Sequence, residues 1–130
     1  MGQLRYSRLN SQHPICSWRA PSDMPVCVRR FYRTHYMSTA AFAQVVKLDD
    51  QIIAFLRYDI SNDTFYALGT YVLPNYRGLG LCKELWRRAL LHVKPKTVKV
   101  NMTSRGAGKL IRSLKKKYPK IDFKAVRAYS

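Results

Sequence analysis

The segment from Val72 to Trp86 reads VLPNYRGLGLCKELW and puts two glycines between an apolar stretch and a helical pattern. Backbone N–H groups in the first turn of a helix lack an intrahelical acceptor and carry partial positive charge. Because glycine has no Cβ, an anion can approach the backbone closely there. We therefore expect a pyrophosphate-binding turn. The groups expected to face the anion are the N–H donors of Arg77, Gly78, Leu79, Gly80, Leu81 and Cys82, with the ammonium of Lys83 at the rim.

Two better-known phosphate-binding motifs do not fit this turn. A dinucleotide-binding fingerprint has a third glycine where this chain has Lys83, and it belongs to a parallel β-α-β unit. A P-loop continues from its glycine into Lys-Ser or Lys-Thr, and this chain does not. A tight strand-to-helix turn without a ligand is the structural alternative.

The sequence on both sides of the turn predicts one α+β domain over residues 1–130, without repeats or linkers. Strand-like runs separated by turn residues at 49–50 and 61–63 predict three consecutive antiparallel strands. Prolines and apolar stripes at helical spacing set the helix limits. The expected strands are 6–9, 41–48, 51–60, 64–73, 97–102 and 121–129, and the expected helices are 23–36, 81–93 and 106–117.

The formal net charge of +17 results from 24 Lys and Arg residues against 7 Asp and Glu residues. Its distribution is uneven, because residues 1–76 hold 8 basic and 5 acidic side chains and residues 77–130 hold 16 and 2. Such self-repulsion is usually tolerated where the partner is a polyanion, so the charge favours a nucleic-acid partner. The alternatives are a solvated basic face, an anionic cofactor alone and an acidic protein.

The composition excludes several classes of protein. A hydrophobic fraction of 47% is typical of a folded domain rather than of a disordered chain. No apolar run is long enough to cross a membrane, and the first residues lack the apolar core of a signal peptide. We therefore expect a cytoplasmic protein (in the host cytoplasm if a phage encodes it), either monomer or homodimer. The three cysteines lack metal-binding spacing, so we expect reduced structural thiols and no metal.

The glycine turn resembles motif A of the GNAT N-acetyltransferases, V-x-P-x-[YW]-R-G-x-G-[IL]-[GAC]-x-x-L after a strand. Asn75 departs mildly from it, since the family usually has Gln or Arg there. The order of elements in residues 40–130 is also similar to that of the family. The matching residues are Val72, Pro74, Tyr76, Arg77, Gly78, Gly80, Leu81, Cys82 and Leu85.

This resemblance implies a GNAT-like domain with flanking helices, whose mostly antiparallel mixed sheet is splayed at the site of acetyl-CoA or a related acyl-CoA. Residues 1–40 would cover the substrate side and residues 41–130 would bind acyl-CoA. The turn from Arg77 to Lys83 would hold the CoA pyrophosphate. Other cofactor contacts would come from Tyr71, Val72, Leu73 and Asn101, and the Leu73 N–H would stabilise the developing oxyanion.

The resemblance also implies catalytic residues, with one departure. The family usually protonates the leaving thiolate with a tyrosine in its last helix, and this chain has Ile111 at that position. Either Tyr118, Ser104 or water takes that role, or the chain is not a standard acetyltransferase. His35 and Tyr36 would lie on the substrate side, where a histidine suits a proton relay. A surface histidine is the alternative.

The pair His35-Tyr36, on so basic a chain, also shows a fainter resemblance to the phage Mom-type enzymes that modify adenine in DNA. The basic residues expected to bind DNA or tRNA are Arg87, Arg88, Arg105, Lys109, Arg112, Lys115, Lys116 and Lys117. Three hypotheses follow for the function. The chain is an acyltransferase of a nucleic-acid base or aminoacyl-tRNA amine, an acetyltransferase of protein or small-molecule amines, or a non-catalytic nucleic-acid-binding protein.

Overall fold

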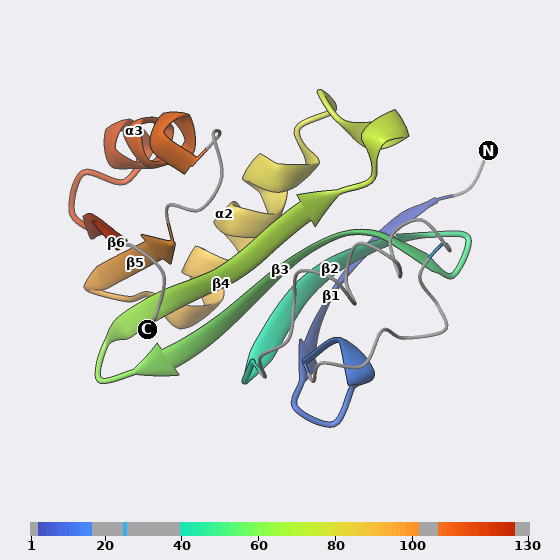
Figure 1. The fold of residues 1–130 in the computed structure, drawn as a ribbon, viewed down its shortest axis with the longest axis horizontal. Coiled ribbons are helices and arrows are strands. Elements are labelled where there is room, and N and C mark those ends of the chain that lie inside the picture. The colour runs from blue at the N-terminus through green and yellow to red at the C-terminus, as the bar shows by residue number, and fades with distance from the viewer. Residues whose placement is uncertain (1–2, 17–24, 26–39, 102–106, 127–130) are drawn as a thin grey trace.

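The computed structural model describes residues 3–16, 25, 40–101 and 107–126. They form one six-stranded sheet in the order β1-β2-β3-β4-β5-β6, with two α-helices and two short 3-10 helices (Figure 1). The strands are β1 Leu4–Asn10, β2 Phe42–Leu48, β3 Gln51–Ser61, β4 Thr64–Val72, β5 Thr97–Asn101 and β6 Asp122–Val126. The helices are η1 Pro14–Cys16, η2 Pro74–Tyr76, α2 Leu81–Val93 and α3 Ala107–Lys117.

The strands β1 to β4 form an antiparallel meander. Two-residue turns join β2 to β3 at Asp49-Asp50 and β3 to β4 at Asn62-Asp63, and all four turn residues have positive φ. This geometry is that of a type I′ hairpin turn, which suits Asn and Asp because they tolerate the left-handed conformation. The predicted three-strand meander is therefore confirmed.

The sheet becomes parallel beyond β4, because β4 pairs with β5, and β5 with β6, in parallel register. The ladder between β4 and β5 ends at the pair Ala67–Val100, whereas β4 continues to Val72. Figure 1 shows β4 running on past β5 toward η2. A mostly antiparallel mixed sheet that is splayed at one point is what the sequence predicted.

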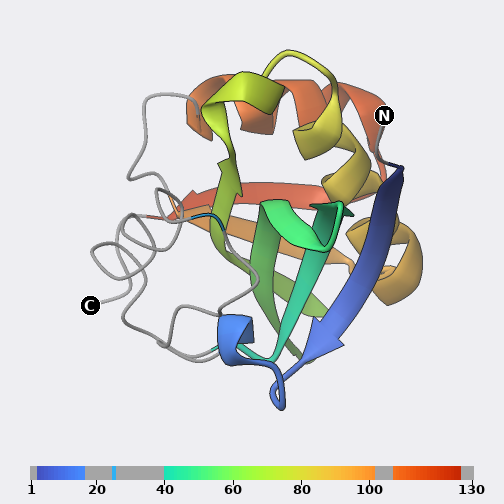
Figure 2. The same ribbon diagram turned by 90° about the vertical axis from the view of Figure 1, so that its right-hand side faces the viewer.

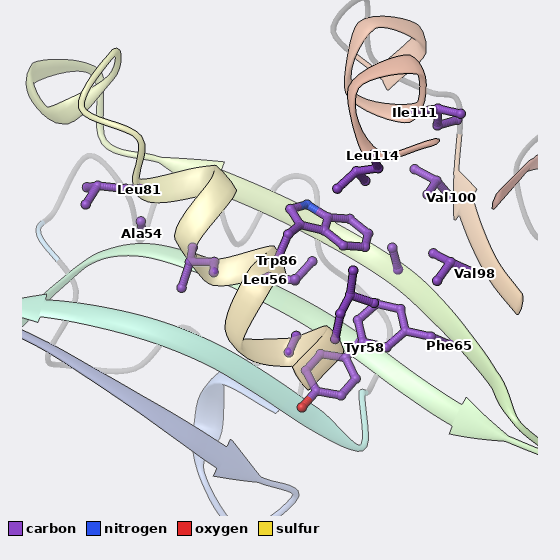
Figure 3. Packing of buried hydrophobic residues seen from close by; sticks show 14 of the residues in the cluster. Ala54, Leu56, Tyr58, Phe65, Leu81, Trp86, Val98, Val100, Ile111 and Leu114 are labelled. Atoms are coloured by element: carbon purple, nitrogen blue, oxygen red, sulfur yellow. The ribbon is translucent and has the colours of Figure 1, made fainter. Parts of the chain in front are cut away.

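The main core lies between the sheet and the two α-helices. The apolar stripe of α2 packs against β2, β3 and β4, and α3 packs against β5 and β6. Aromatic rings form the centre, with centroids 4.5 Å apart for Tyr58 and Phe65 and 5.5 Å apart for Phe65 and Trp86 (Figure 3). Such pairs add to the stability that burial provides.

A smaller core fills the opposite face of the sheet, beneath η1 (Figure 2). Ile15 and Cys16 pack there against Phe55 and its neighbours, because successive side chains of a strand point to opposite faces. Arg57 is fully buried on this face, and its Nε donates a hydrogen bond of 3.0 Å to the Ile15 carbonyl. This bond attaches η1 to the sheet.

The observed limits differ little from the predicted ones. The helix expected at 81–93 is observed at those limits, and β1 is longer than the strand expected at 6–9. The helix expected at 23–36 lies outside the described residues, apart from Pro25. Within the described part of the chain, no helix is long and apolar enough to span a membrane.

Candidate active site

A cleft of about 820 Å³ opens where β4 and β5 part. Residues of β4, the glycine turn, the first part of α2, the end of β5 and α3 surround it. The lining residues are Ala67, Leu68, Gly69, Thr70, Tyr71, Val72, Tyr76, Arg77, Gly78, Gly80, Leu81, Cys82, Lys83, Trp86, Val100 and Leu110.

The wall formed by β4 exposes backbone polar groups to the cleft. The β3–β4 register shifts between Arg57 and Tyr58, whose partners are Gly69 and Ala67, so Leu68 forms a bulge. Beyond this bulge, β4 still pairs with β3 but no longer with β5. An extended ligand can therefore bond to this edge of β4 as an additional strand would.

The register also shows which amides lie on that edge, and it corrects one prediction. The Leu73 N–H donates to the Ile53 carbonyl at 2.8 Å, so the prediction that this amide stabilises an oxyanion is wrong. In antiparallel pairs the bonding groups alternate along the strand. Because Val72 faces Ala54 in the register, its N–H and C=O point away from β3 and toward the cleft.

The glycine turn has the conformation that an anion site requires. Gly78 and Gly80 have φ angles of 82° and 80°, and an added Cβ at either would meet no protein atom within 4 Å. Gly80 is the N-cap of α2 and no side chain caps the helix, while the Glu84 N–H donates to the Gly80 carbonyl at 3.1 Å. The N–H groups of Leu81, Cys82 and Lys83 therefore lack intrahelical acceptors at the positive end of the helix dipole.

One predicted donor of the anion site, the Arg77 N–H, is bonded within the protein, although Arg77 lines the cleft. The Arg77 N–H donates to the Pro74 carbonyl at 3.3 Å, and its guanidinium Nε donates to the Val72 carbonyl at 2.9 Å. Arg77 thus reinforces the end of β4, with its guanidinium 5.6 Å from the centre of the Tyr71 ring. The Leu79 side chain is 67% exposed and does not line the cleft, and that its N–H faces the anion stays a prediction.

A family model bears out what this geometry suggests. The model described as the acetyltransferase (GNAT) family matches residues 10–113. The chain belongs to this family. Membership identifies it as an acyltransferase that uses acetyl-CoA. A search of curated protein sequences found no match.

Solved GNAT structures share the fold at low sequence identity. An IAA acetyltransferase from Bacillus cereus is 17% identical with a TM-score of 0.56, over 88% of this chain and 75% of that one. A ribosomal-protein-alanine N-acetyltransferase from Brucella melitensis is 14% identical with a TM-score of 0.55, over 98% and 94%. The aminoglycoside N-acetyltransferase AAC(6')-Iy in complex with CoA is 14% identical with a TM-score of 0.54, over 100% and 95%. At such identities the likeness shows the fold alone.

The residues of the cleft fit the family's cofactor. The open space above Gly78 and Gly80 leaves the backbone accessible to a pyrophosphate, and Lys83 lines the same region. The edge of β4 offers the Val72 N–H as a donor to an amide-containing arm, while Arg77 Nε already bonds to the Val72 carbonyl. Burial raises the pKa of the Cys82 thiol, which therefore stays neutral and is unsuited to act as a nucleophile.

Tyr118, the one predicted catalytic residue that the structure describes, does not line the cleft. His35, Tyr36, Ser104 and Arg105 lie outside the described residues, as does the side chain of Asn101. Tyr118 follows the end of α3, where its ring lies 6.5 Å from that of Phe123, and it does not line the cleft. Its hydroxyl therefore has no route to the sulfur in this arrangement.

On α3, the residue that lines the cleft is Leu110 and not Ile111, which occupies the family's tyrosine position. Ile111 is 6% exposed and belongs to the main core. Sequence reasoning missed Trp86, because the apolar stripe of α2 assigned it to the core. It did assign Tyr71 and Val72 to the cofactor, and both line the cleft. The β4–β5 ladder adds that the pairing between these two strands ends at Ala67.

The predicted nucleic-acid-binding residues fall into two groups. Glu84 accepts bonds of 2.9 and 2.6 Å from Arg87 and one of 2.9 Å from Arg88. Arg87 is the largest cause of a Glu84 pKa lowered to about 2, so this carboxylate stays charged and compensates the arginines. On α3, by contrast, a hollow of about 450 Å³ is lined by Lys109, Arg112, Ser113, Lys115 and Lys116.

Proposed function

We propose that the protein transfers the acyl group of acetyl-CoA to an amine carried by a nucleic acid. The observation that carries this proposal is the outer face of α3. Lys109, Arg112, Lys115 and Lys116 are exposed there, and none forms an ion pair with a carboxylate of the described residues. Leu110, on the other side of the same helix, lines the cleft. The uncompensated charge therefore lies on the same helix that borders the cofactor site, but on its opposite face.

The amount of positive charge exceeds what the cofactor needs. Residues 77–130 carry 16 basic side chains against 2 acidic ones, and few of them border the anion site. Contacts between such cations and phosphates provide affinity and orientation without choosing a sequence. A base amine inside a duplex would also have to be flipped out to reach the cleft. The charge therefore favours a polyanionic substrate over a small amine.

The residues of the cleft supply binding and polarisation. When bound, acetyl-CoA supplies the acyl group as an activated thioester. The N–H groups of Leu81, Cys82 and Lys83 hold its pyrophosphate, and the free edge of β4 orients its arm. The Val72 N–H, which the register directs to the cleft, replaces Leu73 as the donor to the reacting carbonyl oxygen.

Nucleoside mass spectrometry tests the proposal in cells. DNA and RNA are digested from cells that express the wild type, Gly80→Glu or Leu79→Glu. Glu at 80 puts a carboxylate at the N-terminus of α2, where the pyrophosphate would bind, whereas the Leu79 side chain is exposed and does not line the cleft. We expect an acylated nucleoside with the wild type and Leu79→Glu but not with Gly80→Glu. If the nucleosides and the aminoacyl-tRNA carry no acyl group in any of the three samples, the proposal is contradicted. A protein or small-molecule amine would then be favoured as the substrate.

A further inference from the structure

The indole of Trp86 has a buried donor without an acceptor. The side chain is 1% exposed, and its Nε1 has no hydrogen-bond partner among the residues that the structure describes. Its ring packs against Phe65, with centroids 5.5 Å apart. Figure 3 shows the nitrogen on the edge of the ring that is turned away from Phe65 and Tyr58. Packing therefore explains the position of the ring but not the unpaired N–H.

An unpaired buried donor is unfavourable and uncommon in native proteins, so a missing partner is its simplest explanation. Trp86 lines the acetyl-CoA cleft, as do Ala67 and Val100, the last pair of the β4–β5 ladder. Ala67, Val100 and Leu110, all of which line this cleft, have no polar side-chain atoms. A ligand carbonyl next to Trp86 could therefore accept a hydrogen bond from its Nε1–H.

We propose that Trp86 Nε1–H donates a hydrogen bond to an amide carbonyl oxygen of the pantetheine arm. This inference rests on the proposed use of acetyl-CoA by this cleft. The arm carries two amide carbonyls, in CoA as in acetyl-CoA, so it brings hydrogen-bond acceptors into the cleft. Trp86 is then a positioning residue, which holds the arm between the free edge of β4 and α3.

Replacing one atom tests this role. Trp18 and Trp86 are the only tryptophans, so a Trp18→Phe background leaves position 86 as the sole tryptophan site. In a tryptophan auxotroph, that site can be filled with 3-benzothienylalanine, which keeps the shape of the ring and replaces N–H with sulfur. Calorimetric titration then compares CoA with adenosine 3′-phosphate 5′-diphosphate, which is CoA without the arm.

We expect the replacement to weaken CoA binding about 5- to 10-fold, the usual effect of one neutral hydrogen bond. Binding of the armless nucleotide should not change, since it cannot reach Trp86. In the Trp18→Phe protein, CoA but not the armless nucleotide should also change the emission of Trp86.

Equal CoA affinity for both proteins would overturn the inference, as would an equal loss of affinity for both ligands. Failure of the Trp18→Phe protein and the wild type to bind CoA would overturn the proposed function together with it. Trp86→Phe provides a second variant, because it also removes the donor. Its loss of CoA affinity should exceed its loss of affinity for the armless nucleotide.

Discussion

Removing the charge of α3 should change how strongly salt weakens nucleic-acid binding. The variant replaces Lys109, Arg112, Lys115 and Lys116 with glutamine. All four side chains are exposed, and glutamine is a good helix former, so the fold should be retained. Each cation that contacts a phosphate releases counterions on binding, which sets the slope of log affinity against log salt concentration.

The expected magnitude follows from the number of contacts. If all four side chains contact phosphates of a duplex, the slope becomes shallower by about 3.6. Between 50 and 200 mM salt, the wild type should then lose about 150-fold more affinity than the variant. Fluorescence anisotropy of a labelled duplex, titrated at several KCl concentrations, measures both slopes.

A variant with the same change in charge provides the control. It replaces Lys47, Lys94, Lys96 and Lys99 with glutamine, and none of these four lines the cleft or the hollow on α3. A slope that stays unchanged in the α3 variant would refute the reasoning. Equal shifts in both variants would show that net charge, rather than the surface of α3, governs binding.

Three further predictions concern single residues. Gly78→Ala and Gly80→Ala should each lower the free energy of unfolding, measured in urea, by about 1–2 kcal/mol, because both residues have positive φ; wild-type stability would contradict this. Burial raises the pKa of Cys16 to about 11, above its unfolded value. The contribution of this thiol to the free energy of unfolding is therefore complete below about pH 9 and is lost as the pH rises toward 11. Cys16→Ala should make the free energy of unfolding decline less steeply over that range. Glu84→Gln should tighten DNA binding at low salt, since it releases two arginines; unchanged anisotropy titrations would show that these arginines do not contact phosphates.

The local elements of the fold follow from the sequence because their causes are local. The Asp49-Asp50 turn and the apolar stripe of α2 predict the meander and the helix nearly to the residue. The pairing of Glu84 with Arg87 and Arg88 was also readable, since residues three and four apart meet on a helix. The predicted set of nucleic-acid-binding residues includes Arg87 and Arg88 without allowing for this pairing.

The features that failed depend on contacts between distant segments. Whether the Leu73 amide faces β3 or the cleft is set by the register of two strands, which the residue types leave open. The hydroxyl of Tyr118 makes it a candidate donor in the sequence, but the distance of this hydroxyl from the cleft depends on how α3 packs on β6. The unpaired nitrogen of Trp86 is visible only once its neighbours are placed.

Transfer of a labelled acyl group tests the central claim most directly. Purified protein is incubated with acetyl-CoA labelled with ¹³C in its acetyl group and with DNA or RNA, and the digested nucleosides are analysed by mass spectrometry. The account predicts a nucleoside that carries the labelled acetyl group with the wild type and not with Gly80→Glu. Labelled acetyl-CoA that is consumed without any labelled nucleoside or aminoacyl ester would contradict it.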